Sequence, residues 1–217
     1  MKLLNKFNGL IKAFFTGKIY IDGFLVNADN CVIHKKTKII KPYKIHHTTI
    51  GFGTYVSLNS RISYTEIGRF CSIGPNFFCG YGIHPTNGIS TSPVFYSAQL
   101  QAGFSYSKNN KIEERKKITI GNDVFIGANV VVIDGVTISD GAIIGAGAVV
   151  SKDIPPYAIA VGTPIKIIKY RFEPEVIEKL QKIQWWNKDE TVLKAVEQNF
   201  FDVNKFIELF ENNENGI

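Results

Sequence analysis

An aliphatic residue recurs at every sixth position in the second half of the chain. The series begins at Ile120 and continues with Ile or Val at 126, 132, 138, 144 and 150, while Gly, Asn, Asp and Ser fill many of the positions between. A period of six places apolar residues on no single helical face, and an ordinary half-buried strand alternates for longer before it turns. The pattern predicts short strands joined by tight turns, whose inward residues stack into a coiled parallel sheet.

The first half shows the same rhythm in groups of three. Ile33, Ile39 and Ile45 are six apart, a five-residue step leads to Ile50, and the grouping repeats until Cys79. Three short strands followed by a one-residue deletion indicate the three sides of a triangular coil that closes at a corner. We predict three coils before residue 80 and about two more from 120 to 155, with stability arising from stacking.

The same register assigns the cysteines. Cys31 and Cys71 fall at a small inward position, Cys79 takes a main apolar position, and the three form no CxxC pair. We interpret all three as core residues, because a reactive thiol needs exposure and a lowered pKa. Since no export signal is evident, the cysteines favour a reduced, cytoplasmic protein.

Composition is that of an ordinary globular protein, with 217 residues that are 45% hydrophobic and 20% charged. No apolar run approaches the roughly 18 residues that span a membrane.

The N-terminal segment favours a plain helix packing on a neighbour, with a helix lying on a membrane surface as the alternative, so weak peripheral membrane association stays open. The net charge of +6 is dispersed, which favours a solvated face or a small phosphorylated ligand over nucleic acid.

The repeat stops at His84. The next coil should begin near residue 84 or 85, but His84-Pro85 opens an excursion of some thirty residues without repeat pattern. Such a long excursion is usually functional or disordered, and its aromatic residues argue against full disorder. An imidazole, whose pKa is about 6.5, suits proton transfer near neutral pH. The alternative is a corner histidine that merely bonds a carbonyl group.

Four motifs in order carry a family resemblance: "IGRFCSIGPN" (67–76), "HPTNGISTSPVFYS" (84–97), a repeat-rich stretch from "ITIGNDVFIG" to "KIIKYRF" (118–172) and "IEKLQKIQWW" (177–186). The sequence resembles the hexapeptide-repeat acyltransferases, closest to the branch of xenobiotic acetyltransferases and surface-polysaccharide O-acetyltransferases. The resemblance covers roughly residues 26 to 190. It implies a left-handed parallel β-helix, a homotrimer with active sites between subunits, and acetyl-CoA as co-substrate with no required metal.

The expected fold is mainly β, a left-handed β-helix with a long loop insertion and a short helical C-terminal segment. The segments are 1–25 (helical or irregular), 26–84 (first part of the β-helix), 85–117 (loop insertion), 118–168 (second part of the β-helix) and 169–217 (C-terminal helical segment). Trp185 and Trp186 are expected to cap the open end of the solenoid, with sugar binding as the alternative.

The resemblance implies that His84 is the general base, which deprotonates an acceptor hydroxyl and returns the proton to the departing CoA thiolate. The expected acceptor contacts lie beside His84 and in the excursion, namely Tyr81, Ser90, Thr91, Ser92, Phe95 and Tyr96. Ser90, Thr91 and Ser92 are candidates to orient either His84 or the acceptor, but Ser-Thr-Ser before Pro93 is equally typical of a turn.

Small residues at two turns, "GAN" (127–129) and "GAG" (145–147), suit a pantetheine chain lying along stacked coils, although they also permit tight corners. The resemblance places the adenosine phosphate near the Gly-Thr-Pro turn at 162–164, where basic residues can pair with phosphates. The predicted CoA contacts are Ala128, Asn129, Ala146, Gly147, Thr163, Pro164, Lys166, Lys169 and Arg171.

A zinc site built on His34, His46 and His47 is not favoured. His46 and His47 are adjacent, so an extended strand would direct them to opposite faces, and we predict no metal.

The first hypothesis is an acetyl-CoA-dependent O-acetyltransferase acting on a sugar hydroxyl of a surface polysaccharide (O-antigen or capsule) or its precursor. One alternative is an antibiotic O-acetyltransferase of the streptogramin or chloramphenicol type. Another is a β-helix scaffold without activity. The acceptor would be a small molecule or glycan, not a nucleic acid.

Overall fold

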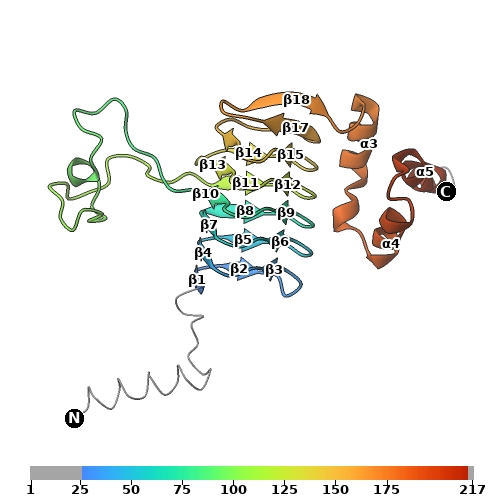
Figure 1. Ribbon diagram of the computed structural model, residues 1–217, viewed down its shortest axis with the longest axis horizontal. Coiled ribbons are helices and arrows are strands. Elements are labelled where there is room, and N and C mark those ends of the chain that lie inside the picture. The colour runs from blue at the N-terminus through green and yellow to red at the C-terminus, as the bar shows by residue number, and fades with distance from the viewer. Residues whose placement is uncertain (1–25, 215–217) are drawn as a thin grey trace, which may run out of the picture.

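The computed structural model describes residues 26–214. The predicted N-terminal segment 1–25 lies outside the described residues. Within them the chain winds into a stacked prism with three parallel sheets as its faces, a strand-free excursion on one side and helices on the other (Figure 1). The predicted mainly β fold, a left-handed parallel β-helix with a short helical C-terminal segment, is confirmed.

Each sheet takes one short strand from successive coils. The first sheet contains β1 (Val26–Asp29), β4 (Tyr43–His46), β7 (Ser60–Ser63), β10 (Phe78–Cys79), β13 (Val131–Val132) and β16 (Val149–Val150). The second contains β2 (Val32–Ile33), β5 (Thr49–Ile50), β8 (Thr65–Ile67), β11 (Ile118–Ile120) and β14 (Thr137–Ile138). The third contains β3 (Lys38–Ile39), β6 (Tyr55–Val56), β9 (Ser72–Ile73), β12 (Phe125–Ile126), β15 (Ile143–Ile144), β17 (Ala158–Val161) and β18 (Lys166–Tyr170), the last antiparallel to β17.

The six-residue repeat becomes columns of stacked side chains. In the second sheet Ile50 pairs with Ile67, Ile67 with Ile120, and Ile120 with Ile138. In the third sheet Ile73 pairs with Ile126, and Ile126 with Ile144. These side chains are buried in one continuous core, and each buried aliphatic side chain contributes about 1.5–3 kcal/mol of transfer free energy.

The cysteines belong to this prism. Cys71 and Cys79 are buried, and burial raises the pKa of each thiol to about 12. Cys31 is half-buried against the core. Thiolates are the nucleophilic form, so Cys71 and Cys79 serve packing, as predicted from the register.

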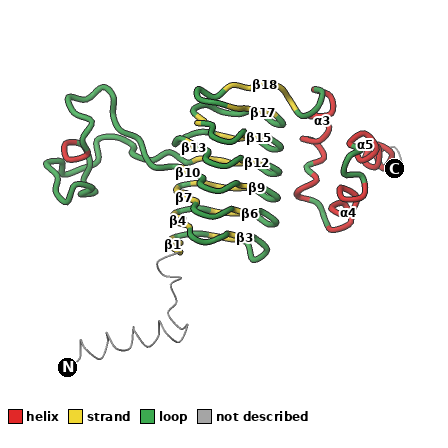
Figure 2. Tube along the Cα trace, viewed as in Figure 1, coloured by secondary structure: helices red, strands yellow, loops and turns green. Residues whose placement is uncertain are grey.

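The C-terminal helices lie against the side of the prism (Figure 2). They are α3 (Pro174–Ile183), a 3₁₀ turn η2 (Trp185–Asn187), α4 (Glu190–Gln198) and α5 (Val203–Glu214). Trp186 is buried with Tyr157, and the Trp185 ring lies 5.3 Å from that of Phe70, which belongs to a middle coil. The prediction that Trp185 and Trp186 cap the open end is therefore wrong, because α3 descends beside the turns between the second and third sheets.

The excursion from 80 to 117, called the arm below, projects from the prism between β10 and β11 (Figure 1). Its one regular element is η1 (Pro93–Phe95). Val94, Tyr96 and Ser97 are buried within it, so the arm has a small core of its own. Among residues 26–214 no helix is long and apolar enough to cross a membrane.

Candidate active site

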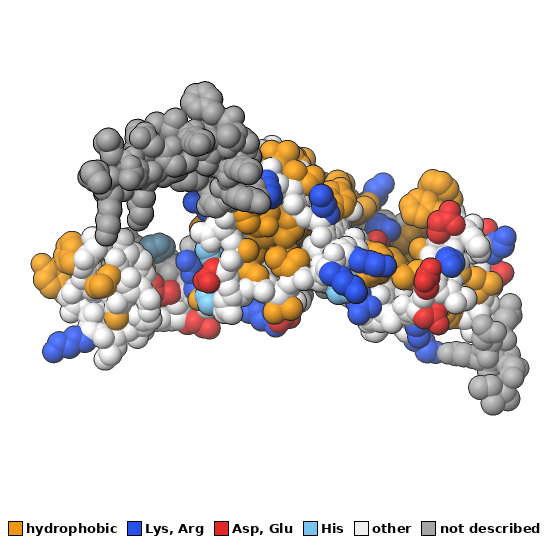
Figure 3. Space-filling view, turned by 90° about the horizontal axis from the view of Figure 1, so that it is seen from below, with side chains coloured by type: hydrophobic (Ala, Val, Ile, Leu, Met, Phe, Trp, Pro, Cys, Tyr) orange, Lys and Arg blue, Asp and Glu red, His pale blue; other side chains and the backbone are white. Residues whose placement is uncertain are grey.

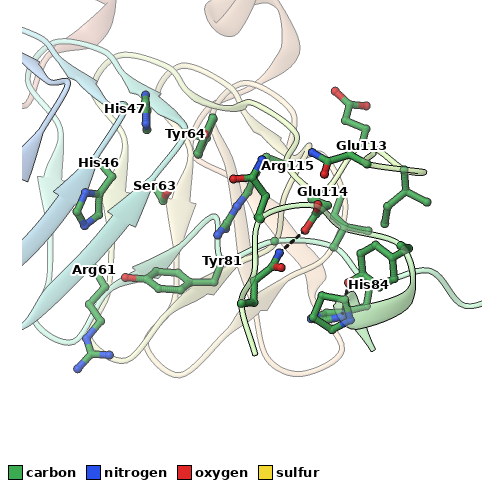
Figure 4. Close-up of a pocket in the computed structure, with 18 of the residues that line it drawn as sticks. His46, His47, Arg61, Ser63, Tyr64, Tyr81, His84, Glu113, Glu114 and Arg115 are labelled. Atoms are coloured by element: carbon green, nitrogen blue, oxygen red, sulfur yellow. Dashed lines mark hydrogen bonds between the residues drawn. The ribbon is translucent and has the colours of Figure 1, made fainter. Parts of the chain in front are cut away.

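His84 lies at the root of the arm, and its ring is exposed at a cavity of about 950 Å³. The cavity is bounded on one side by the arm and on the other by the edge where the first and second sheets meet (Figure 4). A proton-transferring side chain at this position is held near a rigid prism yet remains open to a ligand.

Two contacts orient the His84 imidazole. Its Nδ1 lies 3.0 Å from the Thr91 carbonyl oxygen and 2.8 Å from the Tyr96 hydroxyl. A carbonyl oxygen only accepts, so the Thr91 contact is a hydrogen bond when Nδ1 carries the proton. In that tautomer Nε2 has a free lone pair and can act as a base.

Tyr96 is buried behind the imidazole, with 5% of its surface exposed. Burial, together with the nearby Glu114 carboxylate, raises the pKa of the Tyr96 phenol above its ordinary value. The phenol therefore stays neutral at physiological pH and contributes a fixed dipole beside His84.

Glu114 brings an unsatisfied acceptor to the same cavity. Its Oε2 accepts a hydrogen bond of 2.7 Å from Gln101 Nε2, while the buried Oε1 has no donor among the described residues. A buried acceptor without a partner costs about 1–3 kcal/mol. The site is thus suited to a ligand or water that can donate a hydrogen bond.

The root of the arm is fastened to the next coil by Asp134. Its two carboxylate oxygens accept from Gly82 N at 2.9 Å and from Lys116 N at 3.2 Å, which joins the outgoing and returning chains. Arg115 Nη1 donates to the Gly80 carbonyl at 2.9 Å. Asp134 was not among the predicted site residues, although an Asp at a repeat turn is a recognisable capping signal.

The predicted acceptor contacts fall into two groups. Tyr81 and Tyr96 line the cavity with His84. The other four do not: Ser90 Oγ accepts from Ser92 N in a turn, Thr91 acts through its carbonyl group, and Phe95 stacks on Tyr106 at 5.7 Å.

Several cavity residues were not predicted because they come from coils far from the arm in sequence. The prism side is formed by outward-facing residues of the first sheet and its edge, namely Lys44, His46, His47, Arg61, Ser63 and Tyr64. The prediction that His46 and His47 face opposite ways is wrong, because His47 follows β4 in a left-handed conformation with φ of 47° and stacks on Tyr64. Both histidines line the cavity. No group of three or more potential metal ligands occurs among the described residues.

Comparison with known proteins identifies the family. A model described as bacterial transferase hexapeptide (six repeats) matches residues 117–152. A chloramphenicol acetyltransferase of Morganella morganii is 38% identical over 148 residues, which cover 64% of this chain and 70% of that enzyme. The chain belongs to the hexapeptide-repeat acyltransferase family.

Two further relatives extend the comparison. A chloramphenicol acetyltransferase of Klebsiella aerogenes is 40% identical over 132 residues, covering 59% of this chain and 62% of that enzyme. A solved structure of galactoside acetyltransferase in complex with coenzyme A superposes with a TM-score of 0.51 at 28% identity, covering 67% of this chain and 71% of that one. This chain thus spans less than two thirds of the length of the Klebsiella enzyme.

In this member of the family, most predicted CoA contacts share one edge of the prism. Two successive turns that join the third sheet to the first carry Ala128 with Asn129 and Ala146 with Gly147. Thr163 and Pro164 lie in the turn between β17 and β18, within the third sheet, where Thr163 Oγ1 donates to the Gly147 carbonyl at 3.5 Å. Lys166 and Lys169 follow on β18, where both are exposed.

An asparagine ladder runs up this edge and ends below Gly147. Asn59 Nδ2 donates to Asn76 Oδ1 at 2.7 Å, and Asn76 Nδ2 donates to Asn129 Oδ1 at 2.8 Å. The next coil has Gly147 at the equivalent left-handed position, and the space outside it is open. The Asn129 amide is therefore left without a side chain above it.

Arg171 lies elsewhere. Its Nη1 forms an ion pair of 2.9 Å with Asp123 and also donates to the Gly141 carbonyl at 2.8 Å, at the edge between the second and third sheets. The guanidinium also stacks over Tyr157. The prediction that Arg171 binds CoA is not retained, because Arg171 lies at a different edge of the prism from the other predicted contacts and its Nη1 is paired with Asp123 and Gly141.

Proposed function

We propose that this protein is an acetyl-CoA-dependent O-acetyltransferase that acts by direct transfer, with His84 as general base. His84 Nε2 accepts the proton of an acceptor hydroxyl while the oxygen of that hydroxyl bonds to the acetyl carbonyl carbon. The carbon–sulfur bond of the thioester then breaks, and the same imidazole returns the proton to the CoA thiolate. The single observation that carries this proposal is the His84–Thr91 contact, which is compatible with a base at Nε2.

The proposed acceptor is a sugar hydroxyl of a surface polysaccharide or its precursor. The cavity beside His84 is lined by charged and hydrogen-bonding side chains, including Glu114 with its unsatisfied oxygen. Such a lining suits a ligand with many hydroxyl groups better than a largely apolar one. The exposed Tyr81 ring offers a flat surface for a sugar.

The second candidate is an antibiotic acceptor. The observation in its favour is that relatives at 38–40% identity are named chloramphenicol acetyltransferases. The two matches cover 59% and 64% of this chain.

The proposed CoA site is the edge that carries the asparagine ladder. Small side chains at Ala146 and Gly147 leave the backbone accessible, and the Asn129 amide is available to a pantetheine carbonyl. Lys166 and Lys169 on β18 would pair with phosphates. CoA supplies the activated acetyl group, and these residues hold it in place.

The proposed assembly is a homotrimer with active sites between subunits. The arm projects from the prism and exposes Phe95, Phe104 and Tyr106, with Phe95 and Tyr106 stacked on one another. Exposed aromatic patches of this kind mark interaction surfaces. A second copy would cover them and close the cavity beside His84.

Thiol release from acetyl-CoA tests this function. The purified protein is incubated with sugar nucleotides, glycans, chloramphenicol and a streptogramin, with His84→Ala as the matched inactive variant. We expect acceptor-dependent release with a sugar compound and a fall in kcat of roughly 10²–10⁴-fold in His84→Ala. Turnover that is indifferent to this substitution would contradict the mechanism, and turnover with the antibiotics alone would select the second candidate.

A further inference from the structure

The cavity beside His84 carries charges of both signs. Lys44 and Arg61 stand on the first sheet, whereas Glu113, Glu114 and Arg115 belong to the returning chain of the arm. Arg115 donates to the Gly80 carbonyl at the root of the arm. Basic, acidic and histidine side chains gather where the arm meets the prism (Figure 3). A ligand that occupies this cavity is exposed to both signs of charge.

Lys44 and Arg61 occupy opposed positions on neighbouring strands. They are paired in register on β4 and β7, and each precedes a buried isoleucine, so both side chains point outward from the same face. Neither side chain forms an ion pair or donates a hydrogen bond within residues 26–214. Like charges directly opposite each other on neighbouring strands are destabilising, and a bound anion would relieve this repulsion.

Arg61 is also held in position. Its guanidinium lies over the Phe78 ring, 5.5 Å from the centroid, and this stacking leaves the N–H edges available. A guanidinium fixed in this way suits bidentate recognition of a carboxylate or phosphate.

Tyr81 lies between the cationic side and His84. Its ring is 6.2 Å from that of Phe78 and is 52% exposed. Figure 4 shows the Tyr81 hydroxyl directed toward Arg61, with His84 on the other side of the ring. Burial raises the pKa of the Tyr81 phenol, while Arg61 and Arg115 act in the opposite direction, which places both guanidinium groups near it.

We propose that the acceptor is an anionic sugar, whose carboxylate or phosphate binds Lys44 and Arg61 while its reacting hydroxyl lies at His84. The sugar ring covers Tyr81 between them. Glu113 and Glu114 make the arm side less favourable for the anionic group than the side that carries Lys44 and Arg61. This inference rests on the proposed function and narrows its substrate class, because neutral chloramphenicol has no group for the two cations.

Binding of small probes tests the inference without requiring turnover. Calorimetric titration at low salt compares D-glucuronate, which carries a carboxylate, α-D-glucose 1-phosphate, which carries a phosphate, and neutral D-glucose. The variants are the double substitution Lys44→Gln with Arg61→Gln, and a control, Lys38→Gln with Lys152→Gln, that removes the same charge from exposed positions outside the cavity.

We expect at least one anionic probe to bind the unaltered protein at least tenfold more tightly than glucose. The double variant should lose this preference and the control should keep it. The probe that binds more tightly distinguishes a carboxylate from a phosphate acceptor. Equal binding of glucose and both anions, or an equal loss in the control, would overturn the proposal.

Two further measurements distinguish this inference from a CoA-binding role for the two cations and from the proposed chemistry at His84. In the first, CoA is titrated into the same variants. If the Lys44→Gln, Arg61→Gln double variant loses affinity for CoA but not for the anionic sugars, the two cations bind the co-substrate and the proposal is overturned. His84→Ala should bind the anionic probe as the unaltered protein does. A His84→Ala variant that keeps both turnover and anion binding would therefore contradict the proposed chemistry alone.

Discussion

The prism and the arm are ordered by different means. In the prism each inward side chain stacks on its equivalent in the next coil, as Ile67 does on Ile120. In the arm the order comes from individual polar contacts, such as the Ser105 hydroxyl, which lies 2.6 Å from Ser97 O and accepts from Ser107 N at 2.9 Å. Global stability should therefore depend mainly on the buried columns of the prism, and the position of His84 on the polar contacts of the arm.

The largest expected effect is on the stability of the prism. Ile126 is fully buried in the middle of a column, so Ile126→Ala should lower the free energy of unfolding by about 2–5 kcal/mol. Denaturant unfolding followed by circular dichroism measures the change. Phe95→Ala is the matched change in the arm, where the ring is 49% exposed, and should shift the midpoint little. An equal loss of unfolding free energy in the two variants would contradict the view that the prism, and not the arm, determines global stability.

The second effect falls on the junction of the two regions. Asp134→Ala removes both hydrogen bonds at the root of the arm, so His84 loses its fixed position and kcat should fall at least about tenfold. Asp153→Ala is the control, because Asp153 accepts from Thr137 N in a turn that bears no arm. The thermal midpoints of the two variants should be similar. A normal kcat in Asp134→Ala would show that the hydrogen bonds of Asp134 do not position His84.

A third effect concerns the prism edge alone. Gly147→Asn extends the asparagine ladder at a left-handed position that tolerates Asn, and its side chain would occupy the proposed pantetheine path. We expect the KM for acetyl-CoA to rise roughly tenfold, equivalent to about 1.4 kcal/mol, with stability unchanged. Gly103→Asn is the control, since Gly103 is also left-handed and open but lies in the arm. An unchanged KM would remove this edge from the CoA site.

The smallest effect is expected at β18. Lys166 is exposed, and an exposed ion pair contributes about 0.2–1 kcal/mol, so Lys166→Ala should raise the KM for acetyl-CoA by roughly 1.4- to 5-fold and leave kcat nearly unchanged. Steady-state kinetics at low salt measures the change, with Lys38→Ala on β3 as the control. The effect should shrink as salt is raised. A salt-independent KM would argue against a phosphate contact.

The sequence predicted the prism well because its order is periodic. A column such as the one through Ile120 and Ile138 follows from the six-residue spacing alone. The pairing of Ile67 with Ile120 across the arm does not, because the arm has no repeat pattern. The interruption at His84 was visible for the same reason. Trp185 was misplaced because the helices' packing partner, Phe70, belongs to a coil far away in sequence.

The candidate site was predicted only in part because its contacts are not periodic. The group that orients His84 is a backbone carbonyl at Thr91, which no side-chain pattern can reveal. Arg171 appeared free in sequence, yet its partner Asp123 lies 48 residues earlier. In the sequence Lys44 and Arg61 are two separate outward-facing residues. Only the pairing of β4 with β7 shows that they lie opposite each other.

The central claim is that the Thr91 carbonyl holds the proton on His84 Nδ1, which leaves Nε2 free as the base. Nitrogen-15 NMR of histidine-labelled protein, with His84→Ala to assign the signals, reports the tautomer directly. At a pH where the ring is neutral, we expect Nδ1 to be protonated and Nε2 to be unprotonated. A neutral ring with its proton on Nε2 would contradict it.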